Sequence, residues 1–305
     1  MPLPLSYPGL KCVLENLEAV KRAHIIGRSP GLQKVDKLIP LCLKDFSIYS
    51  NQMEINNLRI YYGRDEVEFE MNGKAFSRKG FASRQDTIKK VFNFYFCERS
   101  TIHVDKVDWG ESSLPDALAL DIKFRVNILI SSFRRQLETA ISFIDVSSFP
   151  LKMLVIIPTN PSIFDMQVVK FAKRLILLVV VDGILTVETL KKLNNKAVIF
   201  NYSGYYRVDN MISLIKYHIE TKKAVETAFI ISTNNIDYIN EKFSEFELAF
   251  GEFQSDLDGV VERFIPGFPK FSIPINNESR IQVYASEDPE EGGRWKIVIK
   301  PVPGL

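Results

Sequence analysis

A short apolar run recurs four times between residues 151 and 233, and this recurrence constrains the fold more than any other feature of the sequence. The runs contain Leu154, Ile176, Val198 and Phe229, so the first three are 22 residues apart and the fourth follows after 31. A period of 20 to 30 residues that holds one strand and one helix is typical of a leucine-rich-repeat-like stack. The sequence therefore predicts stacked β/α repeats, an architecture that more often binds partners than catalyses reactions.

The segments between the runs have the period of amphipathic helices. Apolar residues recur at helical spacing from Phe164 to Ala172, and Thr186 and Asp209 are suitable N-caps for two further helices. After the repeats we expect an acidic helix from Ile236 to Phe253 and an irregular stretch from Phe264 to Pro274. The chain is then predicted to close with a hairpin, in which residues 280–285 pair with residues 294–300.

The segment from residue 41 to residue 150 reads as a β-rich domain. Alternating apolar residues predict strands at Leu41–Tyr49, Met53–Tyr62 and Glu66–Met71. Asn72-Gly73 is the strongest hairpin-turn signal in the chain and should fold residues 74–76 back onto the preceding strand. An amphipathic helix is expected from Arg84 to Arg99, followed by strands at 101–109 and 118–130 and a helix at 134–144.

The first forty residues read as a helical segment. Apolar residues at helical spacing predict a helix from Gly9 to Arg22, and a second short helix is expected from Leu32 to Lys37. We therefore expect an α+β fold with three parts: a helical segment at 1–40, a mostly antiparallel sheet domain at 41–150, and leucine-rich-repeat-like β/α repeats with a C-terminal hairpin at 151–305.

Composition favours a soluble globular protein. The chain has 305 residues, 46% of them apolar, and a formal net charge of +2, which gives no general field for nucleic acid or an acidic membrane. The longest aliphatic run, Leu175–Val181, is too short to cross a bilayer, and the N-terminus lacks the pattern of a signal peptide. Cys12, Cys42 and Cys97 share no metal-type spacing and are expected to be buried thiols. We therefore expect a cytoplasmic or nuclear protein that is not secreted, with neither nucleic acid nor membrane as a partner.

No motif for catalysis, cofactor binding or metal binding is present. The phosphate-binding glycine loops, the zinc-protease motif and the nucleophile elbow are all missing from the sequence. His103 and Asp105 share a predicted strand face and could form a His–carboxylate pair, which we expect to be an exposed pair rather than a general base. The sequence thus predicts a non-enzymatic protein with no cofactor, no metal and no catalytic residues.

A tyrosine-rich segment follows the third apolar run. Tyr202, Tyr205, Tyr206 and Arg207 surround Gly204, and aromatic side chains beside arginine are typical of protein interfaces. The cluster is a candidate partner-binding site. The alternative is that these side chains form the rim of the core.

The N-terminal segment Leu3–Leu17, LPLSYPGLKCVLENL, resembles the opening of the nematode F-box C family. Further similarity is found at Arg28–Leu32, Glu70–Lys74, Leu185–Asn194 and Trp295–Ile299, so the resemblance extends over most of the chain. Proteins of this family have an F-box-like start followed by an F-box-associated region. The segment departs from the usual F-box pattern because it is short and lacks the tryptophan of the last F-box helix.

The resemblance implies a substrate-recognition subunit of a ubiquitin ligase. It implies a Skp-type adaptor as one partner and a protein of unknown identity as the substrate, which the F-box-associated region would hold. The implied adaptor-docking residues are the apolar and proline side chains of the N-terminal segment: Leu5, Pro8, Leu10, Val13, Leu14 and Leu17. The alternative is a protein-interaction module that has lost adaptor binding.

Overall fold

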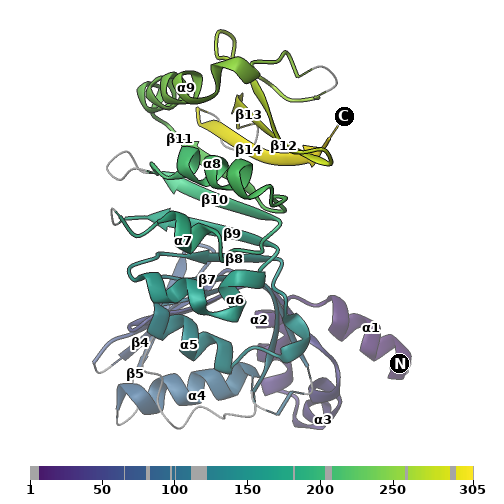
Figure 1. Ribbon diagram of the computed structural model, residues 1–305. Helices are drawn as coiled ribbons and strands as arrows, with labels where there is room; N and C mark the ends of the chain where they lie inside the picture. Colours follow the sequence, from purple (N-terminus) through teal and green to yellow (C-terminus); the bar gives the residue numbers. More distant parts are fainter. Residues whose placement is uncertain are drawn as a thin grey trace. The chain divides into compact units, whose positions relative to one another are not determined.

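The computed structural model describes residues 7–64, 66–79, 83–96, 98–99, 101–110, 122–180, 183–202, 208–257, 260–288 and 293–304 (Figure 1). The chain divides into two compact units, Met1–Phe149 and Pro150–Leu305. The strands and helices of each unit are described separately below.

The first unit begins with three short helices. They are α1 (Tyr7–Asn16), α2 (Ala19–Gly27) and α3 (Pro30–Leu38). The single helix expected from residue 9 to residue 22 is therefore two helices, because Glu18 lies outside both and its side chain caps α2 by accepting a hydrogen bond from the Lys21 N–H. Leu14 of α1 packs with Ile26 and Ile39 in a small apolar cluster that holds the three helices together.

The sheet of the first unit has the strand order β7-β6-β1-β2-β3-β4-β5. Strands β1, β6 and β7 are parallel to one another, whereas β1 to β5 form an antiparallel series in sequence order. The bounds are β1 Leu41–Ile48, β2 Gln52–Ile55, β3 Leu58–Tyr62, β4 Glu66–Met71, β5 Lys74–Lys79, β6 Ile102–Trp109 and β7 Phe124–Ser131. Two helices, α4 (Arg84–Phe96) and α5 (Arg134–Ser142), and the short 3₁₀ turn η1 (Val146–Ser148) complete the unit.

The predicted hairpin at Asn72-Gly73 is confirmed. Strands β4 and β5 pair in antiparallel fashion, with Met71 opposite Lys74. Asn72 and Gly73 have φ values of 52° and 74°, the left-handed conformation that a two-residue hairpin turn requires. This turn fixes the register of β5, and it therefore decides which β5 side chains share a face with Phe69.

An aromatic cluster forms the core of the first unit. Phe46 of β1, Phe92 and Phe96 of α4, and Phe124 of β7 are all fully buried. Their ring centroids lie between 4.8 and 6.4 Å apart, within the range of favourable aromatic pairs. The apolar face of α4 is thereby anchored on the sheet, and residues on the neighbouring face of the helix, such as Phe94, are left toward solvent.

The second unit is built on a sheet with the strand order β12-β13-β14-β11-β10-β9-β8. Strands β8 to β11 are parallel, and β14, β13 and β12 are added in antiparallel fashion beyond β11. The strand bounds are β8 Met153–Ile156, β9 Arg174–Val179, β10 Ala197–Tyr202, β11 Ala228–Thr233, β12 Phe271–Asn276, β13 Ser279–Glu287 and β14 Trp295–Pro303. The helices are η2 Pro161–Asp165, α6 Gln167–Phe171, α7 Val187–Leu190, α8 Met211–Thr221, α9 Ile236–Phe250 and η3 Gly251–Phe253.

The prediction of an α+β fold with leucine-rich-repeat-like repeats is wrong. The four apolar runs are the parallel strands β8 to β11, but they belong to a mixed sheet in which β11 pairs with β14, some 65 residues further along the chain. In a repeat stack each repeat contacts only its neighbours in sequence, so this pairing is not part of such a stack. In the described part of residues 41–150, four of the six strand pairs are antiparallel, as expected, and the two pairs that join β1, β6 and β7 are parallel.

The α9 helix covers one face of the antiparallel part of the second sheet. Phe243 and Phe246 of α9 contact Phe271 of β12 with centroid separations of 6.4 Å. On the other face, Tyr284 of β13 and Val298 of β14 pack against Leu257 and its neighbours. Both faces of this part of the sheet are therefore buried. Strand β12 forms here, although residues 264–274 were expected to be irregular.

None of the helices in the described ranges is long and apolar enough to cross a membrane. The thiols of Cys12 and Cys42 are free and exposed, so the expectation of buried thiols is wrong for these two residues. Cys42 lies on the solvent-facing side of β1, because its neighbours Leu41 and Leu43 take the buried positions of the strand. Cys97 lies outside the described residues.

Candidate functional site

The first unit contains a groove between the end of α2, the β4–β5 hairpin and α4. Its volume is about 420 Å³, within the range of ligand pockets. The lining residues combine aromatic and cationic side chains with a few small or aliphatic ones: His24, Gly27, Arg28, Val67, Phe69, Phe76, Arg78, Lys79, Lys90, Val91, Phe94 and Tyr95. We refer to these residues as the β4–β5 groove.

Aromatic side chains line the β4–β5 groove and remain accessible. Phe69 and Phe76 lie opposite each other on the hairpin and stack, with ring centroids 5.0 Å apart and an interplanar angle of 8°. The ring centroid of Phe94, on α4, lies 5.8 Å from that of His24. Phe76 is 48% exposed and Phe94 is 49% exposed, so two phenylalanine rings are half open to solvent in one groove. Exposed apolar surface gathered in this way marks an interaction site more often than scattered single residues do.

The charged residues that line the β4–β5 groove are all cationic among the described residues. They are Arg28, Arg78, Lys79 and Lys90. The Arg78 guanidinium lies 5.7 Å from the centroid of the Phe76 ring, a cation–π distance. Within the described part of the chain, Arg28, Arg78 and Lys79 form no ion pair with a carboxylate. Their positive charge is therefore not neutralised by a neighbouring side chain.

His24 is held between the aromatic rings and the cations of the groove. Its Nε2 lies 3.4 Å from the hydroxyl of Tyr95. Burial, followed by repulsion from Arg28 and Arg78, lowers the pKa of His24 below the usual value for imidazole. Burial also raises the pKa of Tyr95. Both rings are thus neutral at pH 7, and the arginine and lysine side chains supply the positive charge of the groove.

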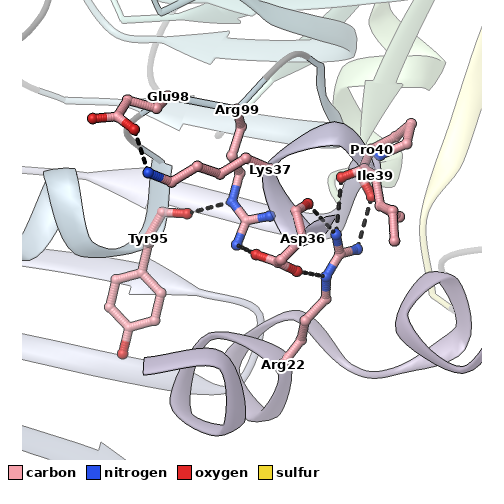
Figure 2. Close-up of polar contacts among 8 residues, drawn as sticks. All are labelled: Arg22, Asp36, Lys37, Ile39, Pro40, Tyr95, Glu98 and Arg99. Carbon is pink, nitrogen blue, oxygen red and sulfur yellow. Dashed lines mark hydrogen bonds and ion pairs between the residues drawn. The ribbon is translucent and has the colours of Figure 1, made fainter. Parts of the chain in front are cut away.

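A buried ionic cluster holds together the helices that form the groove (Figure 2). The carboxylate of Asp36, on α3, contacts both guanidinium groups. Its Oδ1 lies 2.5 Å from Nε of Arg22, and its Oδ2 lies 2.9 Å from Nη2 of Arg99. The side chains are 2%, 3% and 6% exposed for Arg22, Asp36 and Arg99, so a single carboxylate is shared by two buried guanidinium groups. We refer to these three residues as the Asp36 cluster.

Backbone carbonyls accept further hydrogen bonds from the two arginines. Arg22 donates to the carbonyl oxygens of Asp36, Ile39 and Pro40 at 2.8 to 3.0 Å. Arg99 donates through Nε to the carbonyl of Tyr95 at 2.9 Å, as Figure 2 shows. Since Arg22 belongs to α2 and Tyr95 to α4, the cluster fixes two walls of the groove to each other through α3.

β5 is an edge strand beside the groove. In the part of the chain that the structure describes, β5 pairs with β4 and with no other strand. All six of its residues, Lys74 to Lys79, are exposed. An edge strand of this kind presents free N–H and C=O groups to which another extended chain can bind. The groove and the free edge are adjacent because Phe76 and Arg78 belong to both.

The comparison with known protein families gives one match. The family model described as Domain of unknown function (DUF3557) matches residues 83–235, which is half of the chain. The chain belongs to the DUF3557 family. Neither the curated proteins nor the solved structures contain a significant match.

The DUF3557 segment includes α4 but not the other walls of the groove. It supplies Lys90, Val91, Phe94 and Tyr95, whereas α2, β4 and β5 precede it in sequence. The resemblance to nematode F-box C proteins was found most clearly at residues 3–17, which also lie outside the DUF3557 segment. That resemblance therefore stays a prediction.

The predicted adaptor-docking residues lie on or next to α1, and they do not share one exposed face. Leu5 lies outside the described residues. Leu14 is 3% exposed and belongs to the cluster with Ile26 and Ile39, and Leu10 packs against the same cluster. Leu17 is half-buried, Pro8 is exposed, and Val13 is 49% exposed.

The predicted partner-binding cluster begins at the last residue of β10 and continues beyond it in sequence. Tyr202 is the last residue of β10, and its side chain is not among those described. Tyr205, Tyr206 and Arg207 lie outside the described residues.

His103 and Asp105 lie on the solvent-facing side of β6, as two residues of one strand face should. Asp105 accepts a hydrogen bond from Asn127 Nδ2 of β7 at 2.8 Å. The described residues contain no group of three or more His, Cys, Asp or Glu side chains that could hold a metal ion. The β4–β5 groove was not predicted from the sequence, although a phenylalanine flanked by cations in the short strand after Asn72-Gly73 is a signal for it.

Proposed function

We propose that this protein is a non-enzymatic protein-recognition module that binds an extended segment of a partner protein along β5. The observation that carries the proposal is that all six β5 residues are exposed on an edge strand whose Phe76 opens into an aromatic groove. Of the functions that the sequence suggests, this corresponds to the protein-interaction module without adaptor binding. The groove's lining suits binding because aromatic rings supply contact area and the cations supply orientation.

Binding of this kind divides affinity and specificity between two parts of the site. The free N–H and C=O groups of β5 would form main-chain hydrogen bonds with any extended segment. Alternate side chains of that segment would point toward the groove, where Phe76 and Phe94 are each about half exposed. The Asp36 cluster supports this arrangement because it holds α2 and α4 in place before the partner arrives, which reduces the ordering cost of binding.

Display of random peptides tests this proposal. Peptides selected on the full chain should protect the β5 amides from hydrogen exchange. The variant Phe76→Ala should no longer bind these peptides. Phe171→Ala is a matched control, because Phe171 is 49% exposed and Phe76 is 48% exposed, but Phe171 lies on α6 in the second unit. Failure to select any peptide that protects β5 would refute the proposal.

A second candidate function is adaptor binding within a ubiquitin ligase, with the target protein held elsewhere on the chain. The resemblance of residues 3–17 supports it, and so does the exposure of Val13 on α1. The intramolecular packing of Leu10 and Leu14 weighs against it, because an adaptor-docking helix needs its apolar side chains free for the partner.

A pull-down with Skp-type adaptors separates the two candidates. Val13→Asp changes an exposed side chain and should leave the fold intact, whereas Leu14→Asp would place a charge in the cluster with Ile26. Val261→Asp is the control, since Val261 is fully exposed at 100%. Capture by the wild type and by Val261→Asp, but not by Val13→Asp, would establish adaptor binding through α1; no capture by the wild type would exclude this candidate.

We further propose that the protein acts in the cytoplasm or the nucleus. The exposed free thiols of Cys12 and Cys42 support this location, because reducing compartments keep such thiols from forming disulfides. Fluorescence microscopy of the tagged full chain tests it, and a secreted or vesicular signal would contradict it.

A further inference from the structure

We propose that β5 selects acidic segments, and in particular the alternating pattern acidic–x–aromatic–x–acidic. The inference rests on the proposed function and adds the chemistry of the partner to it. The partner would be a protein with an extended acidic stretch, in which the central aromatic ring enters the β4–β5 groove and an acidic side chain flanks it on either side.

The register of the hairpin determines which β5 side chains would meet the partner in the groove. Lys74, Phe76 and Arg78 alternate along β5 and share one face of the strand. Phe76 lies opposite Phe69 and Arg78 lies opposite Val67, and all four of these residues line the groove. A segment added to the free edge of β5 would therefore place every second residue beside Lys74, Phe76 and Arg78 in turn.

The side chains on this face determine what each position prefers. Opposite Phe76, an aromatic residue would extend the existing stack of Phe69 and Phe76. Opposite Lys74 and Arg78, carboxylates would form cross-strand ion pairs, and Arg78 has no carboxylate partner among the described residues. Arg28 and Lys79 also line the groove and add to its positive charge.

The pairing of β5 with β4 shows what the cations on the groove face lack. β4 has the sequence EVEFEM, in which acidic and apolar residues alternate. Phe69 lies opposite Phe76 on the groove face, so the aromatic pairing that we infer for the partner is already present on the β4 side. Lys74 and Arg78 lie opposite Met71 and Val67, so β4 places no carboxylate opposite them, and the inferred segment would supply it from the free side.

Protection against self-association does not account for the whole arrangement. Lysine on an edge strand discourages pairing between two copies of a chain, and Lys74, Arg78 and Lys79 would repel their counterparts in that way. Such protection requires no exposed aromatic rings, yet Phe76 and Phe94 are both about half exposed. Cations that repel a second copy and attract an acidic segment give the edge a preference for one kind of partner.

Four labelled peptides test the inference by fluorescence anisotropy with the full chain. The probe contains Glu-Thr-Phe-Thr-Glu between glycine–serine flanks, and the comparison peptides replace both glutamates with glutamine, both glutamates with lysine, or the phenylalanine with serine. We expect the acidic probe to bind about tenfold more tightly than the lysine peptide, because two cross-strand attractions become repulsions. The glutamine peptide should be intermediate, and the serine peptide should bind weakly.

A charge-reversal variant locates the effect. Arg78→Glu should lose about tenfold in affinity for the acidic probe and gain affinity for the lysine peptide. Arg135→Glu makes the same change of charge on α5, where the side chain is exposed and lines no part of the groove, and it should bind the acidic probe as the wild type does. Restored binding of the lysine peptide to Arg78→Glu would also show that this variant is folded.

The outcomes separate the inference from the proposed function. Equal binding of the acidic, glutamine and lysine peptides with protection of β5 would overturn the acidic preference and leave strand addition in place. Selection of neutral or basic sequences from the random peptide display, with β5 protected, would overturn it as well. If neither the four peptides nor any displayed peptide protects β5, the proposed function fails and the inference fails with it.

Discussion

Replacing Asp36 with asparagine should destabilise the first unit more than any surface substitution. Asp36 is the one carboxylate that Arg22 and Arg99 contact within the described residues, and the side chains of all three are at most 6% exposed. Asparagine keeps the shape and can still accept from Arg22 through Oδ1, but its amide group would point a donor at Nη2 of Arg99. Two buried guanidinium groups would then lack a counter-charge, which typically costs about 3–5 kcal/mol.

The magnitude can be measured by urea unfolding followed through Trp109. Trp109 is 1% exposed in the first unit, and Trp295, the other of the chain's two tryptophans, can be changed to phenylalanine so that the signal reports one unit. With an m-value of about 2 kcal/mol per molar urea, the expected loss lowers the midpoint by about 1.5–2.5 M.

Two further variants define the expected order of effects. Lys37→Ala removes the ion pair between Lys37 and Glu98, whose side chains are 37% and 67% exposed. Because the pair is exposed, the free energy of unfolding should fall by no more than about 1 kcal/mol. Arg99→Met should lie between the two, because Asp36 then retains Arg22 as its partner. Burial lowers the pKa of Arg99 and Asp36 opposes that effect, so removing this guanidinium also removes an unfavourable desolvation. A midpoint for Asp36→Asn within about 0.5 M of that for Lys37→Ala would refute the reasoning.

Two other predictions concern packing and pH. Gly110→Ala should cost about 1–3 kcal/mol, since its Cβ would lie 2.2 Å from Cδ1 of Tyr49, whereas Gly31→Ala, with nothing within 4 Å, should be neutral or stabilising in the same urea assay. Folding lowers the pKa of His24, so the unfolded chain binds the His24 proton more tightly than the folded chain. The first unit should therefore lose none of its free energy of unfolding through His24 above about pH 7. It should lose stability as the pH falls through about 6.5. His24→Gln should reduce this pH dependence, and an unchanged slope of stability against pH would contradict the assignment.

Local patterns in the sequence predicted much of the secondary structure. The alternation in β4 and the Asn72-Gly73 turn gave the hairpin and its register, because both signals depend on neighbouring residues only. The face of α4 was also predicted: Ile88, Val91 and Phe92 are buried. The break between α1 and α2 at Glu18 was not predicted. Glu18 caps α2 without disturbing the helical spacing of the apolar residues on either side of it.

The order of strands could not be derived in the same way. A strand–helix alternation with a period of 22 residues is shared by repeat stacks and by ordinary parallel sheets. What distinguishes them here is the pairing of β11 with β14, a long-range contact between Phe229 and Ile299 that no local pattern encodes. The partly parallel sheet of the first unit was missed for the same reason, because β1 pairs with β6 across about 60 residues.

The candidate site depended on contacts of this kind as well. Phe76 and Phe94 come from different elements and become one groove only after α4 packs on the sheet. The Asp36 cluster joins Arg22, Asp36 and Arg99 from three separate segments, and nothing in their spacing indicates a shared carboxylate. Tyr202, Tyr205 and Tyr206 were predicted as a site because they are close together along the chain. Closeness in sequence is a weaker guide to a binding site than closeness in space.

The most direct test of the central claim is hydrogen exchange of the full chain with and without the acidic probe peptide. If β5 binds the segment as an added strand, the amides of residues 74–79 should exchange more slowly with the peptide present, and the effect should disappear in Arg78→Glu. Unchanged exchange across residues 74–79 at peptide concentrations that saturate the anisotropy signal would contradict the account, because binding would then take place elsewhere on the chain.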